Sequence, residues 1–194
     1  MRTLLNALYT VLLSAASLLP AGTVHAQTDN SIQFDVNGKP YTTTEYTATV
    51  MIGKDKKAIL ALHTSLQTED RMVQLNLDMK KFGEFKPGTV ALGPMDDETI
   101  KNFGLLIDVI GDGLATSDDP NAGGPDSREI NADSDKGSFT LTAARVEGSS
   151  AIISGRFEFS GTNAIEIGTV KKVSVKGSFK NLEINCLSPD LLKR

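Results

Sequence analysis

The residues best suited to chemistry are the carboxylates of an acidic, glycine-rich segment, residues 111–136. Its candidate calcium ligands are Asp112, Asp118, Asp119, Asn131, Asp133 and Asp135. Ca²⁺ takes about six to eight oxygen ligands, and the last three residues have the alternating spacing of a calcium loop. The helix–loop–helix signature is incomplete, because Gly137 comes one place late and Thr142 replaces the final Glu. Two interpretations therefore stand, a calcium site and a charged, solvated loop.

The small number of histidine and cysteine residues limits which other catalytic chemistries are open to the chain. The chain has two histidines and one cysteine, and removal of a leader containing His25 would leave His63 as the one imidazole. Zinc sites built on several His or Cys ligands are then excluded, and a Ser–His–Asp or Cys–His nucleophile would have to use His63. His63 shares a strand face with Ile59 and Ala61, which indicates a packed or rim position. Cys186 is predicted to be a buried, inert thiol.

Other enzyme signatures are missing from the sequence. It has no Gly-x-Ser-x-Gly elbow, phosphate-binding loop or dinucleotide fingerprint. The many carboxylates would allow a glycosidase pair, but nothing marks two of them as buried. The sequence therefore favours a protein that is not an enzyme, and the catalytic alternative is an acid- or metal-dependent hydrolase that uses residues 111–136.

The first 26 residues have the pattern of a secretory signal peptide. Arg2 precedes the apolar stretch 4–19, and Val24-His25-Ala26 places small residues before a cleavage site. The apolar stretch is too short for a transmembrane helix, which needs about 20 residues. We expect residues 27–194 to form a single exported β-domain, periplasmic or secreted. No cysteine follows the cleavage site to accept a lipid.

Charge and composition restrict the partners. The formal net charge is −4, with no clustered basic stretch, so nucleic-acid binding is not expected. A basic amphipathic helix for a membrane surface is also missing. The expected partner is a protein or a small ligand, and calcium is the one cofactor that the pattern suggests.

The alternation of apolar and polar residues predicts strands throughout the chain after residue 26. Ile32, Phe34 and Val36 precede Asn37-Gly38, which is a strong hairpin signal. Further strands are expected at 41–52, 58–66, 72–79, 89–92 and 103–110. Residues 73, 75, 77 and 79 should form a buried face. Residues 111–136 then interrupt the strands, and connections of this length are usually functional or disordered.

Three Gly-x-Phe tripeptides, at 137–139, 155–157 and 177–179, each open a further β run. We interpret them as the starts of every second strand, in which Gly relieves crowding and Phe anchors the core. Coincidence in a glycine-rich β protein is the alternative. Partner strands are expected at 151–153 and 170–175, turns at 148–150 and 161–163, and a loosely held tail at 186–194.

Several of these segments resemble a group of exported β-domains of unknown function from bacteria of the Bacteroidetes type. The segments are Phe34-Asp35-Val36-Asn37-Gly38-Lys39-Pro40-Tyr41, the turn Pro87-Gly88-Thr89 with its short strand, and the closing strands 152–159 and 175–182. The resemblance covers most of the chain after residue 26 and implies a β fold and export. It carries over no catalytic residue. Many members of the group are lipoproteins, and this chain differs because it has no lipid-acceptor cysteine.

Nine or ten short strands without a helix predict an all-β fold, either an antiparallel β-sandwich or a closed β-barrel. The leading functional hypothesis is an exported, non-enzymatic β-domain that acts as a binding or structural module. A second form of it is a lipocalin-like carrier of a small apolar ligand. Its pocket would be lined by residues around Leu75, Leu77, Leu105 and Phe157.

Overall fold

The computed structural model describes residues 29–68, 71–95, 102–110, 128–163 and 172–188, and all regular elements in these ranges are strands. The strands are β1 (Ser31–Val36), β2 (Lys39–Thr43), β3 (Thr47–Ile52), β4 (Lys57–Gln67), β5 (Arg71–Glu84), β6 (Gly88–Leu92), β7 (Phe103–Ile110), β8 (Arg128–Glu147), β9 (Ser150–Asn163) and β10 (Lys172–Leu187). The predicted all-β class is therefore confirmed.

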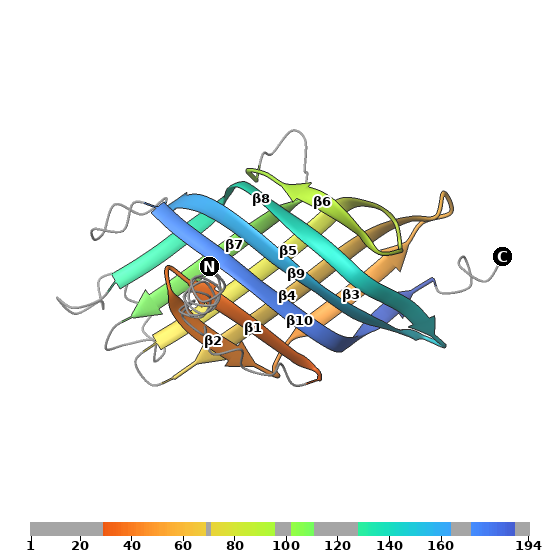
Figure 1. Ribbon diagram of the computed structural model, residues 1–194, viewed down its shortest axis with the longest axis horizontal. Helices are drawn as coiled ribbons and strands as arrows, with labels where there is room; N and C mark the ends of the chain where they lie inside the picture. The colour runs from red at the N-terminus through yellow and green to blue at the C-terminus, as the bar shows by residue number, and fades with distance from the viewer. Residues whose placement is uncertain (1–28, 69–70, 96–101, 111–127, 164–171, 189–194) are drawn as a thin grey trace, which may run out of the picture.

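Seven of these strands close into a barrel, which decides between the two predicted architectures. The closed ring runs β3-β4-β5-β7-β8-β9-β10 and returns to β3. The last contact is short and parallel, with Leu187 of β10 beside Met51 of β3, whereas the other pairs are antiparallel. Figure 1 shows β8, β9 and β10 crossing in front of β3, β4 and β5.

Three strands are bonded outside the closed ring. β1 pairs with the first half of β10, and β2 pairs with β1 through the two-residue turn Asn37-Gly38. Both turn residues have positive φ, 52° and 89°, which a primed hairpin turn requires. The predicted hairpin is thus confirmed. β6 pairs with the middle of β8.

The sequence placed some strand ends wrongly. The predicted strand 41–52 is interrupted at residues 44–46 and divides into β2 and β3. β8 begins at Arg128, so the last nine residues of the segment 111–136 belong to a strand rather than to a loop. The predicted turn 161–163 lies within β9. Cys186 lies in β10, where it is a free thiol. It is 4% exposed, which confirms its predicted burial.

The Gly-x-Phe tripeptides lie in the middle of three neighbouring strands and do not open alternate strands. Gly155 stands directly opposite Phe179, and Gly177 directly opposite Phe157. A Cβ at Gly155 would lie 2.6 Å from Cζ of Phe179 and would also meet the carbonyl oxygen of Thr140. Glycine therefore makes room for a ring of the next strand, which confirms that it relieves crowding and that Phe anchors the core.

Residues 1–26, with the predicted signal peptide, lie outside the described residues. Within the described ranges, no helix has the length and hydropathy needed to cross a membrane.

Candidate binding surface

The barrel interior is filled where a carrier pocket was expected. Leu75, Leu77 and Phe157 point inward and are 1%, 0% and 2% exposed. The rings of Phe139 and Phe179 stack there with their centroids 5.5 Å apart. Side chains of the strands thus occupy the space that an apolar ligand would need.

Leu105 does not line the interior, which corrects the predicted pocket. Along β7 the inward positions are Gly104, Leu106 and Asp108, and Leu105 lies on the outer wall, where it is half-buried. The register of β7 with β5 decides which side chains of β7 point inward, because it places Leu106 opposite the buried Leu75. Successive side chains of a strand point to opposite faces, so burial of Leu106 directs Leu105 outward.

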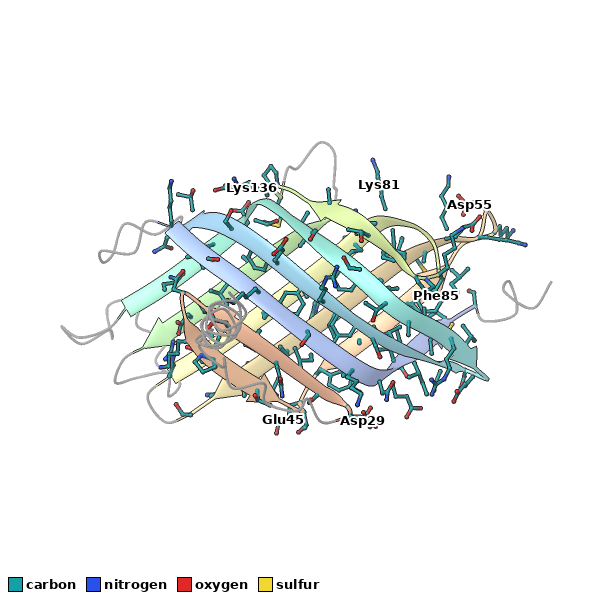
Figure 2. All side chains as sticks on the ribbon, viewed as in Figure 1. Asp29, Glu45, Asp55, Lys81, Phe85 and Lys136 are labelled. Atoms are coloured by element: carbon teal, nitrogen blue, oxygen red, sulfur yellow. The ribbon has the colours of Figure 1, made fainter. Side chains whose placement is uncertain are left out.

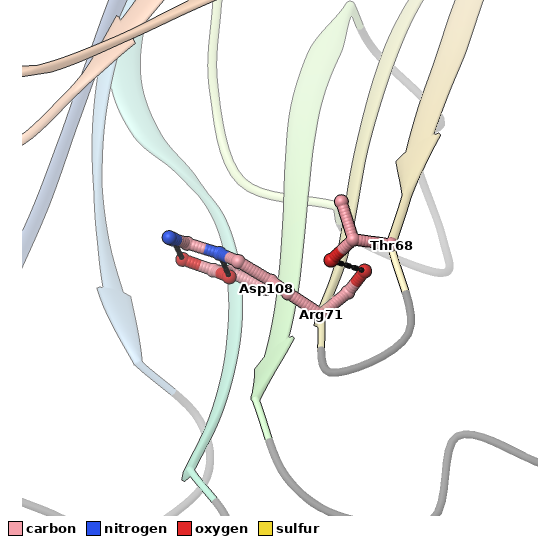
Figure 3. A network of polar contacts seen from close by, with 3 residues as sticks. All are labelled: Thr68, Arg71 and Asp108. Atoms are coloured by element: carbon pink, nitrogen blue, oxygen red, sulfur yellow. Dashed lines mark hydrogen bonds and ion pairs between the residues drawn. The ribbon is translucent and has the colours of Figure 1, made fainter.

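A buried ion pair lies at the end of the barrel where β5 begins and β7 ends. Arg71 donates from Nε to Oδ1 of Asp108 at 2.8 Å and from Nη2 to Oδ2 at 2.6 Å. Figure 3 shows this two-pronged contact and the Thr68 hydroxyl that donates to the Arg71 carbonyl oxygen. The Asp108 side chain is only 4% exposed, so Arg71 compensates a charge that water does not reach.

Tyr41 of β2 covers this ion pair. Its ring lies 5.2 Å from Cζ of Arg71 and stacks on Phe34 with centroids 5.1 Å apart. The Tyr41 hydroxyl oxygen is buried and has no hydrogen-bond partner among the described residues. Burial, and after it the negative charge of Asp108, raise the pKa of Tyr41 against the opposing effect of Arg71. Arg71, Asp108 and Tyr41 are thus a packed structural cluster inside the wall.

His63 lies on the outer wall of β4, which confirms that it shares a face with Ile59 and Ala61. Its Nε2 is 3.1 Å from Oδ2 of Asp78 on β5. Among the described residues, no serine, threonine or cysteine side chain is hydrogen-bonded to this imidazole. The pair is thus a partly buried contact between the outer faces of β4 and β5.

The predicted calcium ligands fall into two groups. Asp112, Asp118 and Asp119 lie outside the described residues. Asn131, Asp133 and Asp135 lie on β8, in extended backbone rather than in a loop. Oδ2 of Asp133 accepts from the Met95 amide at 3.2 Å, and Oδ2 of Asp135 accepts from the Thr162 hydroxyl at 2.9 Å. Within the described ranges, no group of three or more His, Cys, Asp or Glu side chains is placed to hold a metal ion.

One outer hollow, of about 760 Å³, lies over β6, β8, β9, β10, β1 and β2. Two cross-strand rows line it: Thr89, Thr140, Arg156, Ser178, Gln33 and Thr42, and beside them Ser138, Glu158, Lys176, Asp35 and Pro40. Phe34, Tyr41, Gly177 and Phe157, the last a residue of the predicted carrier pocket, also line it. Its cations and carboxylates alternate, since Lys176 stands between Glu158 and Asp35. Because positive and negative side chains alternate, this hollow favours neither an anionic nor a cationic ligand.

A second outer hollow, of about 740 Å³, has a different character, and we call it the Met51 hollow. It is lined by residues 51–55, 57–59, 80, 81, 83 and 188 of β3, β4, β5 and the end of β10. Its floor carries Met51 and Ile59, which stand opposite each other and are 44% and 37% exposed. Leu187 stands beside Met51 and is 51% exposed. Leu187, Met51 and Ile59 form a continuous apolar row across three strands.

Lysines also line the Met51 hollow. Lys54, Lys57, Lys80 and Lys81 line the Met51 hollow, and Asp55 is the one acid among its lining residues. Asp55 is already engaged, because its Oδ2 lies 3.2 Å from Nζ of Lys57. Figure 2 shows Lys81 and Asp55 pointing away from the ribbon. The hollow therefore has a positive charge in a chain whose net charge is negative.

A β-bulge places two of the lysines. Ala58 pairs with Gly83 and Leu60 with Met79, so Ile59 faces the three residues 80–82 of β5. The extra residues break the alternation, and Lys80 and Lys81 are both exposed while Phe82 is buried. Gly83 has a φ of 90°, a conformation in which glycine is strongly favoured. Bulges of this kind commonly redirect side chains at functional sites.

The sequence analysis missed the Met51 hollow. The visible signals were Lys80-Lys81 followed by Phe82-Gly83, which breaks the strict alternation of 72–79, and the lysines of the turn 53–57. Neither signal shows by itself that the two segments lie side by side. Comparison of the chain with models of protein families, with curated proteins and with solved structures finds no match.

Proposed function

We propose that the protein is an exported, non-enzymatic binding module that holds its ligand on the outer wall of the barrel, in the Met51 hollow. The observation that carries the proposal is the apolar row of Leu187, Met51 and Ile59, which is exposed across three hydrogen-bonded strands. Export rests on the signal-peptide pattern of the first 26 residues.

The size and composition of the hollow favour a small ligand. Ligand pockets usually measure about 300–1,000 Å³ and combine an apolar floor with a few polar groups. The Met51 hollow has a volume of about 740 Å³, an apolar floor and a lysine rim. Exposed large apolar side chains that lie next to one another commonly mark binding sites.

The alternative is the lipocalin-like carrier, which would hold a ligand inside the barrel. The closed barrel favours it, because such carriers are barrels. The stacked Phe139 and Phe179 rings and the full burial of Leu77 argue against it, since an inner ligand would have to displace them. The two proposals therefore differ in which wall of the barrel touches the ligand.

A neutral dye that fluoresces in apolar surroundings, Nile red, tests the proposed function. The wild-type protein should enhance the fluorescence saturably, and the variant Met51→Ser/Ile59→Ser should lose most of the enhancement. Met72→Ser is the matched control, because Met72 is a partly exposed methionine of β5 about 26 Å along the strand from Lys80. Equal enhancement by all three proteins would overturn the outer-wall site.

A further inference from the structure

We propose that the Met51 hollow selects a single-chain amphiphile with an anionic head, a fatty carboxylate, held as a free molecule. This inference rests on the proposed function and adds the class of ligand. The apolar row would receive the chain, and the lysines beyond Ile59 would receive the carboxylate.

The charge of the hollow fits such a head. Lys54, Lys80 and Lys81 make no ion pair within 4.0 Å among the described residues, whereas Lys57 is paired with Asp55. Among the described residues, no carboxylate therefore neutralises these three ammonium groups. A carboxylate head would form charge-assisted hydrogen bonds with these ammonium groups, which are shorter and stronger than the neutral hydrogen bonds that an alcohol head would form.

The geometry separates chain from head along one line. The row crosses β10, β3 and β4 in the order Leu187, Met51, Ile59. Neighbouring strands are about 4.8 Å apart, so the row spans about 10 Å from Leu187 to Ile59. The next strand is β5, where the bulge exposes Lys80 and Lys81 opposite Ile59. An extended chain laid across the strands would thus end with its head at the two lysines.

The shape of the site favours a free amphiphile over a lipid bilayer. Met51 and Ile59 line a hollow, with Leu187 beside it, rather than a protruding loop or helix face. Proteins that enter a bilayer present their apolar groups on a projecting surface that reaches about 5–10 Å into the headgroup boundary. A concave site instead encloses one molecule.

Calorimetric titration with decanoate and decylammonium below their micelle concentrations, and with decanol below its solubility limit, separates the contribution of the apolar chain from that of the charged head. At neutral pH and low salt, decanoate should bind about tenfold more tightly than decanol, because two exposed ion pairs contribute roughly threefold each. Decylammonium should bind most weakly. The Lys80→Gln/Lys81→Gln variant should bind decanoate and decanol equally, while Lys176→Gln, an exposed lysine on the polar outer face, should behave as wild type.

The outcomes distinguish the inference from the proposed function. Equal affinity for decanoate and decanol, with both lost in Met51→Ser/Ile59→Ser, would keep the binding module and reject the anionic head. Failure of all three amphiphiles to bind would reject both. Attachment to phosphatidylglycerol vesicles without decanoate binding would assign the lysines to a membrane surface and overturn the inference. The decanoate preference should also shrink in about 1 M salt, where the Debye length is roughly 3 Å.

Discussion

Met51 and Ile59 stand directly opposite each other on β3 and β4, and both point away from the interior of the barrel. On the next strand, β5, the bulge opposite Ile59 exposes two consecutive lysines. The apolar and cationic halves of the Met51 hollow thus arise from neighbouring positions of one sheet. The account of binding depends on this adjacency.

The two faces of the wall should differ sharply in their tolerance of substitution. Met51→Ser should lower the free energy of unfolding by less than about 1 kcal/mol, because the side chain is already 44% exposed. Met79→Ala should lower it by about 2–5 kcal/mol, because Met79 is fully buried and truncation leaves a cavity. Urea denaturation measures both values. Equal losses would show that Met51 is packed rather than exposed.

The bulge should depend on Gly83. Gly83→Ala should lower the free energy of unfolding by about 1 kcal/mol or more, because a side chain is strained at a φ of 90°. Gly93→Ala is the control, since its φ is not positive and an added Cβ there meets nothing within 4 Å. If Gly83→Ala unfolds at the same urea concentration as Gly93→Ala, the backbone does not need glycine there.

Removal of one partner of the Arg71–Asp108 ion pair should destabilise the fold strongly, whereas replacement of both partners by apolar residues should destabilise it little. Arg71→Met leaves the buried Asp108 carboxylate without its partner, so the free energy of unfolding should fall by about 3–5 kcal/mol. The double variant Arg71→Met/Asp108→Leu should recover most of this loss, since no buried charge is left. Chemical denaturation of both variants measures the difference. A double variant as unstable as Arg71→Met would contradict the account of the pair.

Tyr41 should make stability fall in alkali. Its raised pKa means that the folded protein keeps the phenolic proton at a pH where the unfolded chain, with a pKa of about 10, has lost it. The contribution is constant below about pH 10 and is lost as pH rises through the higher, folded pKa. Tyr41→Phe should therefore flatten the alkaline decline in the free energy of unfolding. An unchanged alkaline slope in that variant would contradict the assignment.

The three calcium candidates that the structure describes, Asn131, Asp133 and Asp135, should not by themselves make calcium raise the melting temperature. A ligand that binds only the folded state must raise the melting temperature. The Asp133 and Asp135 carboxylates accept hydrogen bonds from Met95 and Thr162 and are not gathered around one point. We therefore expect no calcium-dependent rise in the melting temperature from these three residues, and a melt with about a millimolar calcium compared with one in a chelator measures it. A higher melting temperature with calcium would restore the metal site.

The sequence predicted the local structure well where one rule decided it. Strict alternation from Val73 to Met79 predicted the buried face of β5, and Asn37-Gly38 predicted the turn between β1 and β2. Glycine was misleading within longer strands. Gly155 and Gly177 read as strand starts, but each stands in the middle of a strand to admit a neighbouring Phe ring. Contacts across strands decide the role of such glycines, and one sequence does not contain them.

The Met51 hollow could not be predicted for the same reason. Its apolar row joins Leu187, near the end of the described chain, to Met51 through the parallel contact that closes the barrel. Its charges depend on the bulge that exposes Lys81, a position that strict alternation would have buried. Leu105 was assigned to the wrong face because a continuous apolar run gives no alternation from which to choose.

Methyl NMR of methionine tests the central claim most directly, because Met51 and Met79 report on the two sides of the wall. Protein labelled at the methionine methyl groups is titrated with decanoate, and Met51→Leu assigns the outer signal. The account predicts a saturable shift of the Met51 signal while the signal of the interior Met79 stays in place. A shift of Met79 with Met51 unmoved would place the ligand inside the barrel and contradict the outer-wall site.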